Sequence, residues 1–259
     1  MKTPEIVPEK IDSHINVKIL LLIGLSATVF QYVLSSLFTP DDVDLIVSIV
    51  SIINPLAAAF AGFLISYRYR KSIIFGKSYL FLSFGFLSVF LGEITYLIYD
   101  LILGIEPYPS IADVFFFAYS PLLIIYLIIN IRFFQPITKH TTIIWVAAIP
   151  TIIILTYAGL SLYETEDVGF DFYYGSIFVI ATSITLSFTI LCTKIFKDGT
   201  LGKSWLILLF GILALTLGDD IYYYLEITEN YDLTHPVNIL WYAGYWIITY
   251  ALLKHKEII

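Results

Sequence analysis

Length, composition and charge exclude an ordinary soluble domain. The chain has 259 residues, of which 59% are apolar and 14% are charged, whereas soluble domains have roughly 45 to 50% apolar and about 25% charged residues. The composition predicts an all-α polytopic membrane protein. A single cysteine, Cys192, excludes an intramolecular disulfide and a metal cluster built on cysteine.

Eight apolar runs are long enough to cross a bilayer, which needs about 20 mostly apolar residues. The first run is longer than the apolar core of a signal peptide, roughly 7 to 15 residues, so we expect it to be retained as a span. The predicted spans cover residues 17–38, 45–67, 78–103, 111–133, 142–162, 172–193, 204–226 and 236–253.

Prolines and charged residues separate these runs. Pro40 and the two aspartates after it are expected to end the first run. Pro107 and Pro109 break the third run from the fourth, because a proline disfavours helix in the residue before it. Ser110 is placed to cap the helix that follows.

Charges alternate between successive connections. Every even-numbered connection and the C-terminal tail carry Lys or Arg, whereas the odd-numbered connections are acidic. The net charge of −7 therefore says little about partners. Because Lys and Arg in short loops favour the cytoplasmic side, we expect a cell-membrane protein with both termini in the cytoplasm.

Two segments of the chain are copies of one another. Residues 76–93, GKSYLFLSFGFLSVFLGE, align without gaps with residues 202–219, GKSWLILLFGILALTLGD. We interpret this match as an internal duplication. Each half has four predicted spans, so both halves cross the membrane the same way up, which predicts two parallel four-helix repeats related by a twofold axis along the membrane normal.

The predicted organisation divides the chain into five parts. A cytoplasmic segment, 1–16, precedes the first repeat, 17–133. A cytoplasmic linker, 134–141, leads to the second repeat, 142–254, and a cytoplasmic tail, 255–259, follows.

Four glycines lie on one face of the third and seventh predicted helices, where small residues let two helices approach closely. This face either joins the third and seventh helices as a central pair, or packs within its own half of the chain. The sequence leaves both alternatives open for Gly85, Gly92, Gly211 and Gly218.

Carboxylates recur beside tyrosines on the third and seventh helices. A carboxylate inside a bilayer costs roughly 2.5 to 3.5 kcal/mol on insertion scales, so it usually faces a cavity or a partner. With the predicted topology these groups lie in the outer half of the membrane, which predicts an acidic, tyrosine-lined pocket open to the outside between the repeats. Its expected ligand-binding residues are Glu93, Tyr96, Asp100, Asp113, Asp219, Asp220, Tyr223 and His235.

Such a pocket could hold a cation, a polar headgroup or a proton. Alternatively, Glu93 and Asp219 are structural and accept hydrogen bonds from Tyr or Trp side chains across the repeat interface. His235 could be a metal ligand, a proton shuttle or a polar residue at a helix start, and the last interpretation is favoured. Zinc sites normally need several His or Cys ligands, so we expect no metal, and the sequence names no cofactor.

Residues 92–122, GEITYLIYDLILGIEPYPSIADVFFFAYSPL, resemble the multi-pass membrane input modules that precede diguanylate cyclase, phosphodiesterase or histidine-kinase domains in bacterial signalling proteins. The resemblance implies an eight-helix sensory module. No catalytic domain follows the eighth helix in this sequence, so such a sensor is expected to signal through a separate partner. The matching positions are Glu93, Pro107, Pro109, Ser110, Ala112, Asp113, Tyr119 and Pro121.

Two other functions remain open. The first is an intramembrane hydrolase acting on a lipid headgroup, with Glu93, Asp219 or Asp220 activating water as a general base. The chain has a weaker similarity to the lysoplasmalogenase-type membrane hydrolases, which are also eight-helix proteins. The second is a small-solute transporter. The lipid bilayer is an expected partner in each case, and nucleic acid is not.

The predicted topology can be tested by labelling. Single cysteines introduced near the termini or in even-numbered connections, in a Cys192→Ser background, should resist a membrane-impermeant thiol reagent on intact cells. Cysteines in the odd-numbered connections should react, because they are predicted to lie outside. Reaction at the termini of intact cells would invert the topology.

Overall fold

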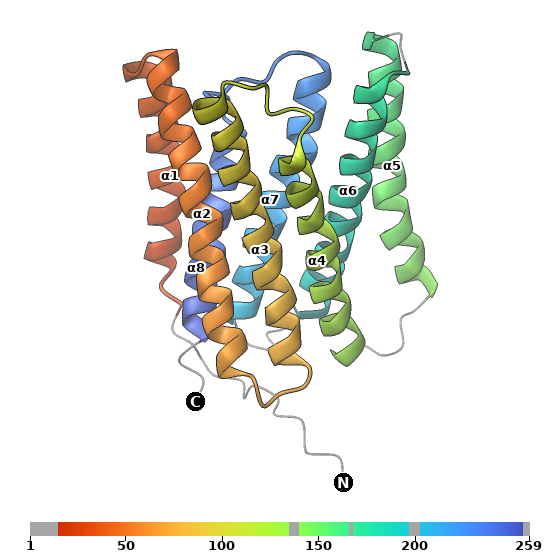
Figure 1. Cartoon of the computed structure of the whole chain (residues 1–259). Helices are drawn as coiled ribbons and strands as arrows, with labels where there is room; N and C mark the ends of the chain where they lie inside the picture. Colours follow the sequence, from red (N-terminus) through yellow and green to blue (C-terminus); the bar gives the residue numbers. More distant parts are fainter. Residues whose placement is uncertain (1–14, 135–139, 166–167, 197–202, 256–259) are drawn as a thin grey trace.

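The computed structural model describes residues 15–134, 140–165, 168–196 and 203–255, and these residues form eight long helices with no strand (Figure 1). Most of the predicted linker and cytoplasmic tail, and nearly all of the N-terminal segment, lie outside the described residues. The helices are α1 Val17–Leu37, α2 Pro40–Arg68, α3 Phe75–Leu97 continued by the π-helical segment η1 Ile98–Leu103, α4 Ile111–Phe134, α5 His140–Thr165, α6 Phe170–Phe196, α7 Lys203–Ile227 and α8 Asn238–His255.

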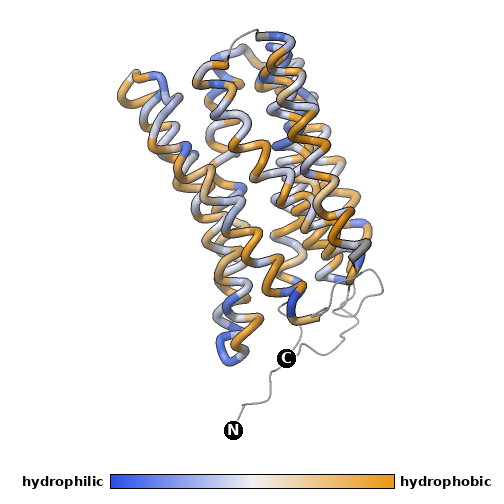
Figure 2. The backbone as a smooth tube through the Cα atoms, turned by 90° about the vertical axis from the view of Figure 1, so that its right-hand side faces the viewer, coloured by the Kyte–Doolittle hydropathy of each residue, from blue (hydrophilic) through white to orange (hydrophobic). Residues whose placement is uncertain are grey.

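Each of the eight predicted runs forms a helix. Seven of the helices, all except α8, are long and apolar enough to cross a membrane, which indicates a multi-pass membrane protein. Hydrophobic residues extend along much of each helix, and hydrophilic residues gather mainly near the turns (Figure 2). The all-helical fold class is therefore confirmed.

Helix α2 begins earlier than predicted. Thr39 is the N-cap residue, and its hydroxyl accepts a hydrogen bond from the N–H of Asp42 at 3.4 Å. Pro40 occupies the first helical position, where its fixed φ suits the helix and its missing N–H costs nothing. Asp41 and Asp42 lie in the first turn, where negative charge interacts favourably with the helix dipole. The first helix therefore ends before Pro40, as predicted, whereas the second begins at Pro40 and not at the predicted residue 45.

Six helices form a closed ring. Each helix in the order α2, α3, α4, α6, α7 and α8 packs against the next, and α8 packs against α2. Outside the ring, α1 packs against α8, and α5 packs against α6 and α7. Only 6% of the residues in the apolar stretch of α5 are buried. Exposed apolar surface of this extent is typical of contact with a membrane or a partner protein.

The glycines pack within each half of the chain. A methyl carbon added at Gly92 would lie 2.7 Å from the ring of Phe116 in α4, and one added at Gly218 would lie 2.8 Å from the indole nitrogen of Trp241 in α8. The glycine face thus brings α3 close to α4 and α7 close to α8. Packing within each half is confirmed, and the alternative of α3 and α7 as a closely approaching central pair is wrong.

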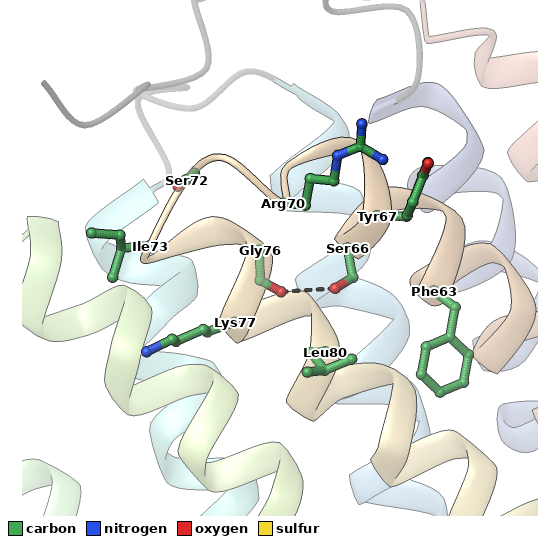
Figure 3. A pocket seen from close by; sticks show the side chains of 9 residues that line it. All are labelled: Phe63, Ser66, Tyr67, Arg70, Ser72, Ile73, Gly76, Lys77 and Leu80. Atoms are coloured by element: carbon green, nitrogen blue, oxygen red, sulfur yellow. Dashed lines mark hydrogen bonds between the residues drawn. The ribbon is translucent and has the colours of Figure 1, made fainter. Parts of the chain in front are cut away.

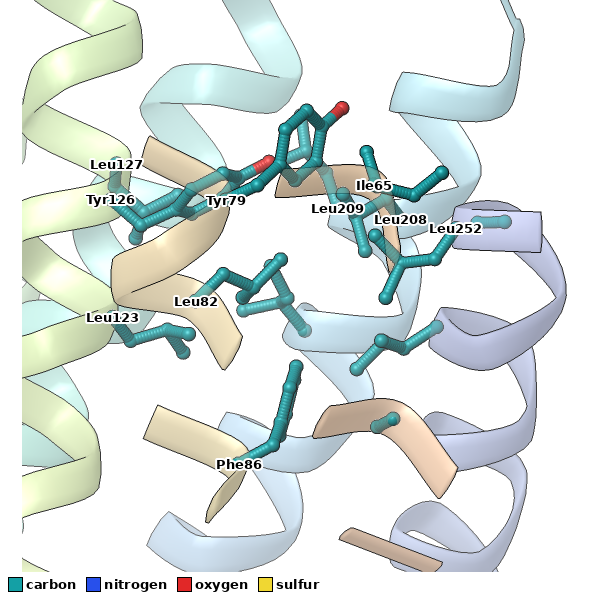
Figure 4. Close-up of a cluster of buried hydrophobic side chains, with 14 of the residues drawn as sticks. Ile65, Tyr79, Leu82, Phe86, Leu123, Tyr126, Leu127, Leu208, Leu209 and Leu252 are labelled. Atoms are coloured by element: carbon teal, nitrogen blue, oxygen red, sulfur yellow. The ribbon is translucent and has the colours of Figure 1, made fainter. Parts of the chain in front are cut away.

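The helices α3 and α7 meet through large side chains instead. The ring of Trp205 in α7 lies 5.6 Å from that of Tyr79 and 5.9 Å from that of Phe75 in α3, measured between centroids. Deeper in the core, Phe86 of α3 belongs to the same buried cluster as Leu208 of α7 (Figure 4). Such bulky residues fill the ring and hold the two backbones apart.

Charges are segregated along the bundle. The start of α1 meets the end of α8, where the N–H of Asn16 donates to the hydroxyl of Tyr250 at 3.0 Å. Because the helices alternate in direction, every described Lys and Arg lies toward this end, which we call the basic end. Every described Asp and Glu lies in the opposite half of the bundle, which we call the acidic end.

The two equivalent glycines, Gly85 and Gly211, should respond differently to substitution. A methyl carbon at Gly211 would lie 2.5 Å from Ile248 and 3.0 Å from the carbonyl oxygen of Gly244, whereas the nearest atom to one at Gly85 is 3.5 Å away. We expect Gly211→Ala to lower the free energy of unfolding by about 1 to 3 kcal/mol through overpacking. Gly85→Ala should leave it unchanged or raise it by up to about 1 kcal/mol, because alanine favours helix. Thermal unfolding of both purified variants measures the difference, and equal losses would contradict it.

Candidate functional site

Glu93 and Asp219 occupy equivalent places in the duplicated segment. Both lie in the acidic-end halves of their helices, α3 and α7, and each follows a tightly packed glycine. Both side chains are half-buried. Tyr245 of α8 is close enough to both carboxyl groups for their charges to act on its hydroxyl. The fold thus brings the two acids to one interior region.

The two acids differ in their hydrogen bonding. The indole N–H of Trp241 donates to Oδ1 of Asp219 at 2.9 Å. In the first half, the ring beside the glycine belongs to Phe116, which has no donor. Within the described ranges, the side chain of Glu93 has no hydrogen-bond partner. A structural role therefore fits Asp219, although its indole donor comes from the same half of the chain and not from across the halves.

Asp220 faces a different neighbour. Its side chain is 5% exposed, and its Oδ1 accepts a hydrogen bond from the hydroxyl of Thr182 in α6 at 2.5 Å. The other oxygen has no partner in the part of the chain that the structure describes. Successive helical residues point about 100° apart, so Asp219 contacts α8 while Asp220 contacts α6.

Asp113 stabilises the start of α4. The hydroxyl of Ser110 accepts the N–H of Ala112 at 3.1 Å, and the N–H of Ser110 donates to Oδ2 of Asp113 at 2.6 Å, which is a reciprocal capping arrangement. The hydroxyl of Tyr174 in α6 donates to the other oxygen at 2.7 Å. The predicted cap at Ser110 is confirmed, and Asp113 links this cap to α6.

The turn between η1 and α4 is also tied to α6. The hydroxyl of Tyr108, between Pro107 and Pro109, donates to Oδ1 of Asp171 at 2.7 Å. Its ring lies 4.8 Å from that of Tyr174, edge to face. Burial, and then the bond to Asp171, raise the pKa of Tyr108, although a tyrosine hydroxyl is already a donor at neutral pH without this shift. This turn thus joins the two halves of the chain at the acidic end.

Two predicted site residues on the third helix lie nearer the surface. Tyr96 is 41% exposed, and its hydroxyl is within electrostatic range of Glu93. Asp100 is exposed in η1, within range of Asp44 at the start of α2. Tyr96 thus lies near Glu93, whereas Asp100 lies near the surface beside α2.

The predicted residues of the second half have other neighbours. The ring of Tyr223 is 5.6 Å from that of Phe178 in α6. Nδ1 of His235 accepts the N–H of Val237 at 3.1 Å, just before α8 begins. His235 thus lies just before a helix start, and its ring nitrogen accepts a hydrogen bond from the backbone there.

Aromatic rings lie beside the two central acids. The ring of Tyr222 is 4.7 Å from that of Tyr231 and 5.8 Å from that of Trp241. Tyr231 and Tyr242 are both within electrostatic range of Glu93. Carboxylates and aromatic faces together can attract a small organic cation by charge and by cation–π contact. In the described ranges, no group of three or more His, Cys, Asp and Glu side chains could hold a metal ion.

Sequence reasoning missed the contribution of α8 to this region. Trp241, Tyr242 and Tyr245 all reach toward the two acids. Their one signal in the sequence is the i, i+4 spacing of Trp241 and Tyr245, which places these two on one face of a helix. Aromatic residues are too common in this chain for that spacing to stand out.

No protein-family model matches this chain, and neither a curated protein nor a solved structure matches it. The fold itself defines a class, an all-helical multi-pass membrane protein with an acidic and aromatic cluster inside one end of its bundle.

The hydrogen bond between Trp241 and Asp219 can be tested by Trp241→Phe. The substitution places a phenylalanine beside Gly218, as Phe116 lies beside Gly92. We expect the free energy of unfolding to fall by about 1 to 3 kcal/mol, because a half-buried carboxyl group loses its donor. Trp246→Phe is the matched control, since Trp246 lies exposed on the same helix and should change stability by no more than about 0.5 kcal/mol. Equal melting shifts in the two variants would contradict the structural role of Asp219.

Proposed function

We propose that the protein is a membrane sensor that binds a small organic cation at Glu93 and relays its occupancy to a separate partner. The observation that carries the proposal is the state of Glu93, a half-buried carboxyl group with no hydrogen-bond partner among the described residues. An isolated carboxylate within a bilayer is costly. A bound cation would offset that cost, which gives the site a reason to favour a positively charged ligand.

The surroundings of Glu93 support an organic cation in particular. Asp219 contributes a second carboxyl group held by Trp241. Tyr231 and Tyr242 contribute rings and hydroxyls within electrostatic range of Glu93. An ammonium group can pair with the carboxylate while its alkyl substituents contact the aromatic rings.

The proposal includes two parallel four-helix repeats with both termini in the cytoplasm. The packing of α3 on α4 has its counterpart in the packing of α7 on α8, with an acid after the packed glycine in each case. The contact of α2 with α8 has its counterpart in that of α6 with α4. The outer helices differ, since α1 packs on α8 whereas α5 packs on α6 and α7.

This arrangement supports a simple relay. Contacts at the glycines make α3 with α4, and α7 with α8, two joined pairs. Side chains alone join the pairs, as where the ring of Phe86 meets that of Tyr245 at 5.9 Å. A cation held between Glu93 of α3 and the tyrosines of α8 would pull the pairs together. The resemblance of residues 92–122 to sensor input modules supports the same role.

Ligand-induced thermal stabilisation tests the proposal. Purified wild-type protein should melt at a higher temperature with choline or tetramethylammonium, because a ligand at 100 times its Kd adds about 2.7 kcal/mol to stability. Glu93→Gln should abolish the shift while leaving the ligand-free melting temperature nearly unchanged. Asp41→Asn removes an exposed acid at the same end and should keep the full shift.

Three outcomes would overturn the sensor proposal. The first is the absence of a Glu93-dependent rise in melting temperature, either because neither cation causes a rise or because the rise persists in Glu93→Gln. The second is Glu93-dependent turnover of a mixed lipid extract, which would favour the hydrolase. The third is Glu93-dependent flux of a cation into liposomes, which would favour a transporter.

A further inference from the structure

A pocket lies at the basic end, at the opposite end of the bundle from Glu93. It opens between α2 and α3 and has a volume of about 680 Å³, within the range of roughly 300 to 1,000 Å³ that is common for ligand sites. The pocket is built from the end of α2, the turn after it and the first turns of α3 (Figure 3). Its lining residues are Phe63, Ser66, Tyr67, Arg70, Ser72, Ile73, Gly76, Lys77 and Leu80.

Two serine hydroxyl groups and a close backbone approach hold the wall of this pocket in place. The hydroxyl of Ser66 in α2 donates to the carbonyl oxygen of Gly76 in α3 at 2.8 Å (Figure 3). A methyl carbon at Gly76 would lie 2.6 Å from the carbonyl oxygen of Tyr69, so only glycine fits there without displacement. The hydroxyl of Ser72 accepts the N–H of Phe75 at 2.9 Å, which fixes the turn. The pocket is therefore preorganised.

The charged part of the pocket suits an anion. Arg70 and Lys77 are both exposed, and none of the nine lining residues is acidic. The guanidinium carbon of Arg70 lies 4.3 Å from the ring centroid of Tyr67, a cation–π contact that orients it. The N-terminal turn of α3, which carries Lys77, adds the positive end of the helix dipole.

The apolar part of the pocket lies deeper along the helices. Leu80 is one turn inward from Lys77, about 4.5 Å at 1.5 Å per residue, and Phe63 is one turn inward from Tyr67. Leu80 is 38% exposed and Ile73 is 60% exposed. A soluble anion would use the charged mouth alone. A molecule with a charged head and an apolar tail would use the whole pocket.

We propose that this pocket binds an anionic phospholipid, with the phosphate at Arg70, one acyl chain along Phe63 and Leu80, and Lys77 adding positive charge on another side of the pocket (Figure 3). Basic pockets between helices at a membrane interface suit acidic headgroups, and Arg forms paired hydrogen bonds with phosphate oxygens. The bound lipid joins α2 to α3 at the end where the described basic residues gather. This inference stands independently of the cation site at Glu93.

Native mass spectrometry of the purified full chain tests the proposal. The detergent-solubilised protein is titrated with phosphatidylglycerol and with phosphatidylcholine of identical acyl chains. We expect a one-to-one phosphatidylglycerol adduct at a concentration at least about tenfold lower than for phosphatidylcholine. Arg70→Gln with Lys77→Gln should weaken phosphatidylglycerol binding by about tenfold or more, because charge-assisted hydrogen bonds are lost.

The matched control is Arg132→Gln with Lys194→Gln. It removes two exposed positive charges at the same end from α4 and α6, which do not line the pocket, and should retain the adduct. Leu80→Ala tests the apolar part and should weaken the adduct without a change of charge, while size-exclusion and melting profiles check folding.

Each of four results would overturn the proposal. These are equal binding of the two lipids, equal losses in the pocket variant and the control variant, full retention in Leu80→Ala, and complete displacement of the lipid by excess inorganic phosphate. The last two would identify a site for a free anion.

Discussion

The close approach of α7 to α8 at Gly218 is the contact on which the acidic cluster depends. Because Gly218 has no side chain, the indole of Trp241 can lie against the backbone of α7 and donate to the next residue, Asp219. The same approach at Gly92 brings Phe116 against α3. In both halves, therefore, a small residue sets the helix spacing and the following acid is turned toward the interior.

The two acids at equivalent sequence positions differ in their hydrogen bonds. Each of the two aligned segments supplies one acid, yet only Asp219 receives an indole donor. A carboxyl group that already accepts a hydrogen bond contributes to stability and is less available to a ligand. The carboxyl group of Glu93 accepts none from the described residues and can still accept one. Equivalent positions in two similar segments can thus differ in hydrogen bonding when one aromatic residue differs.

The separation of charge divides the bundle into two chemically different ends. The acidic end holds carboxyl groups beside tyrosines and tryptophan, which suits a cation. The basic end holds a pocket with Arg70 and Lys77 at its mouth and Phe63 and Leu80 deeper inside, which suits an anionic lipid. Between them, the packed core around Tyr79 and Trp205 leaves the two proposed sites connected only through the helices themselves.

The sequence by itself determined the eight helices, the alternation of charge between their ends and the recurrence of a glycine before an acid. These features are local, since hydropathy, proline positions and spacing act along one segment at a time. Only the tertiary structure decided that Gly92 packs against α4 and Gly218 against α8. A glycine permits another helix to approach closely, but the sequence does not indicate which helix that is. It also decided that Asp113 and Asp220 bond to α6 while Glu93 has no partner in the described chain, since hydrogen bonding between helices depends on how each is rotated against its neighbours.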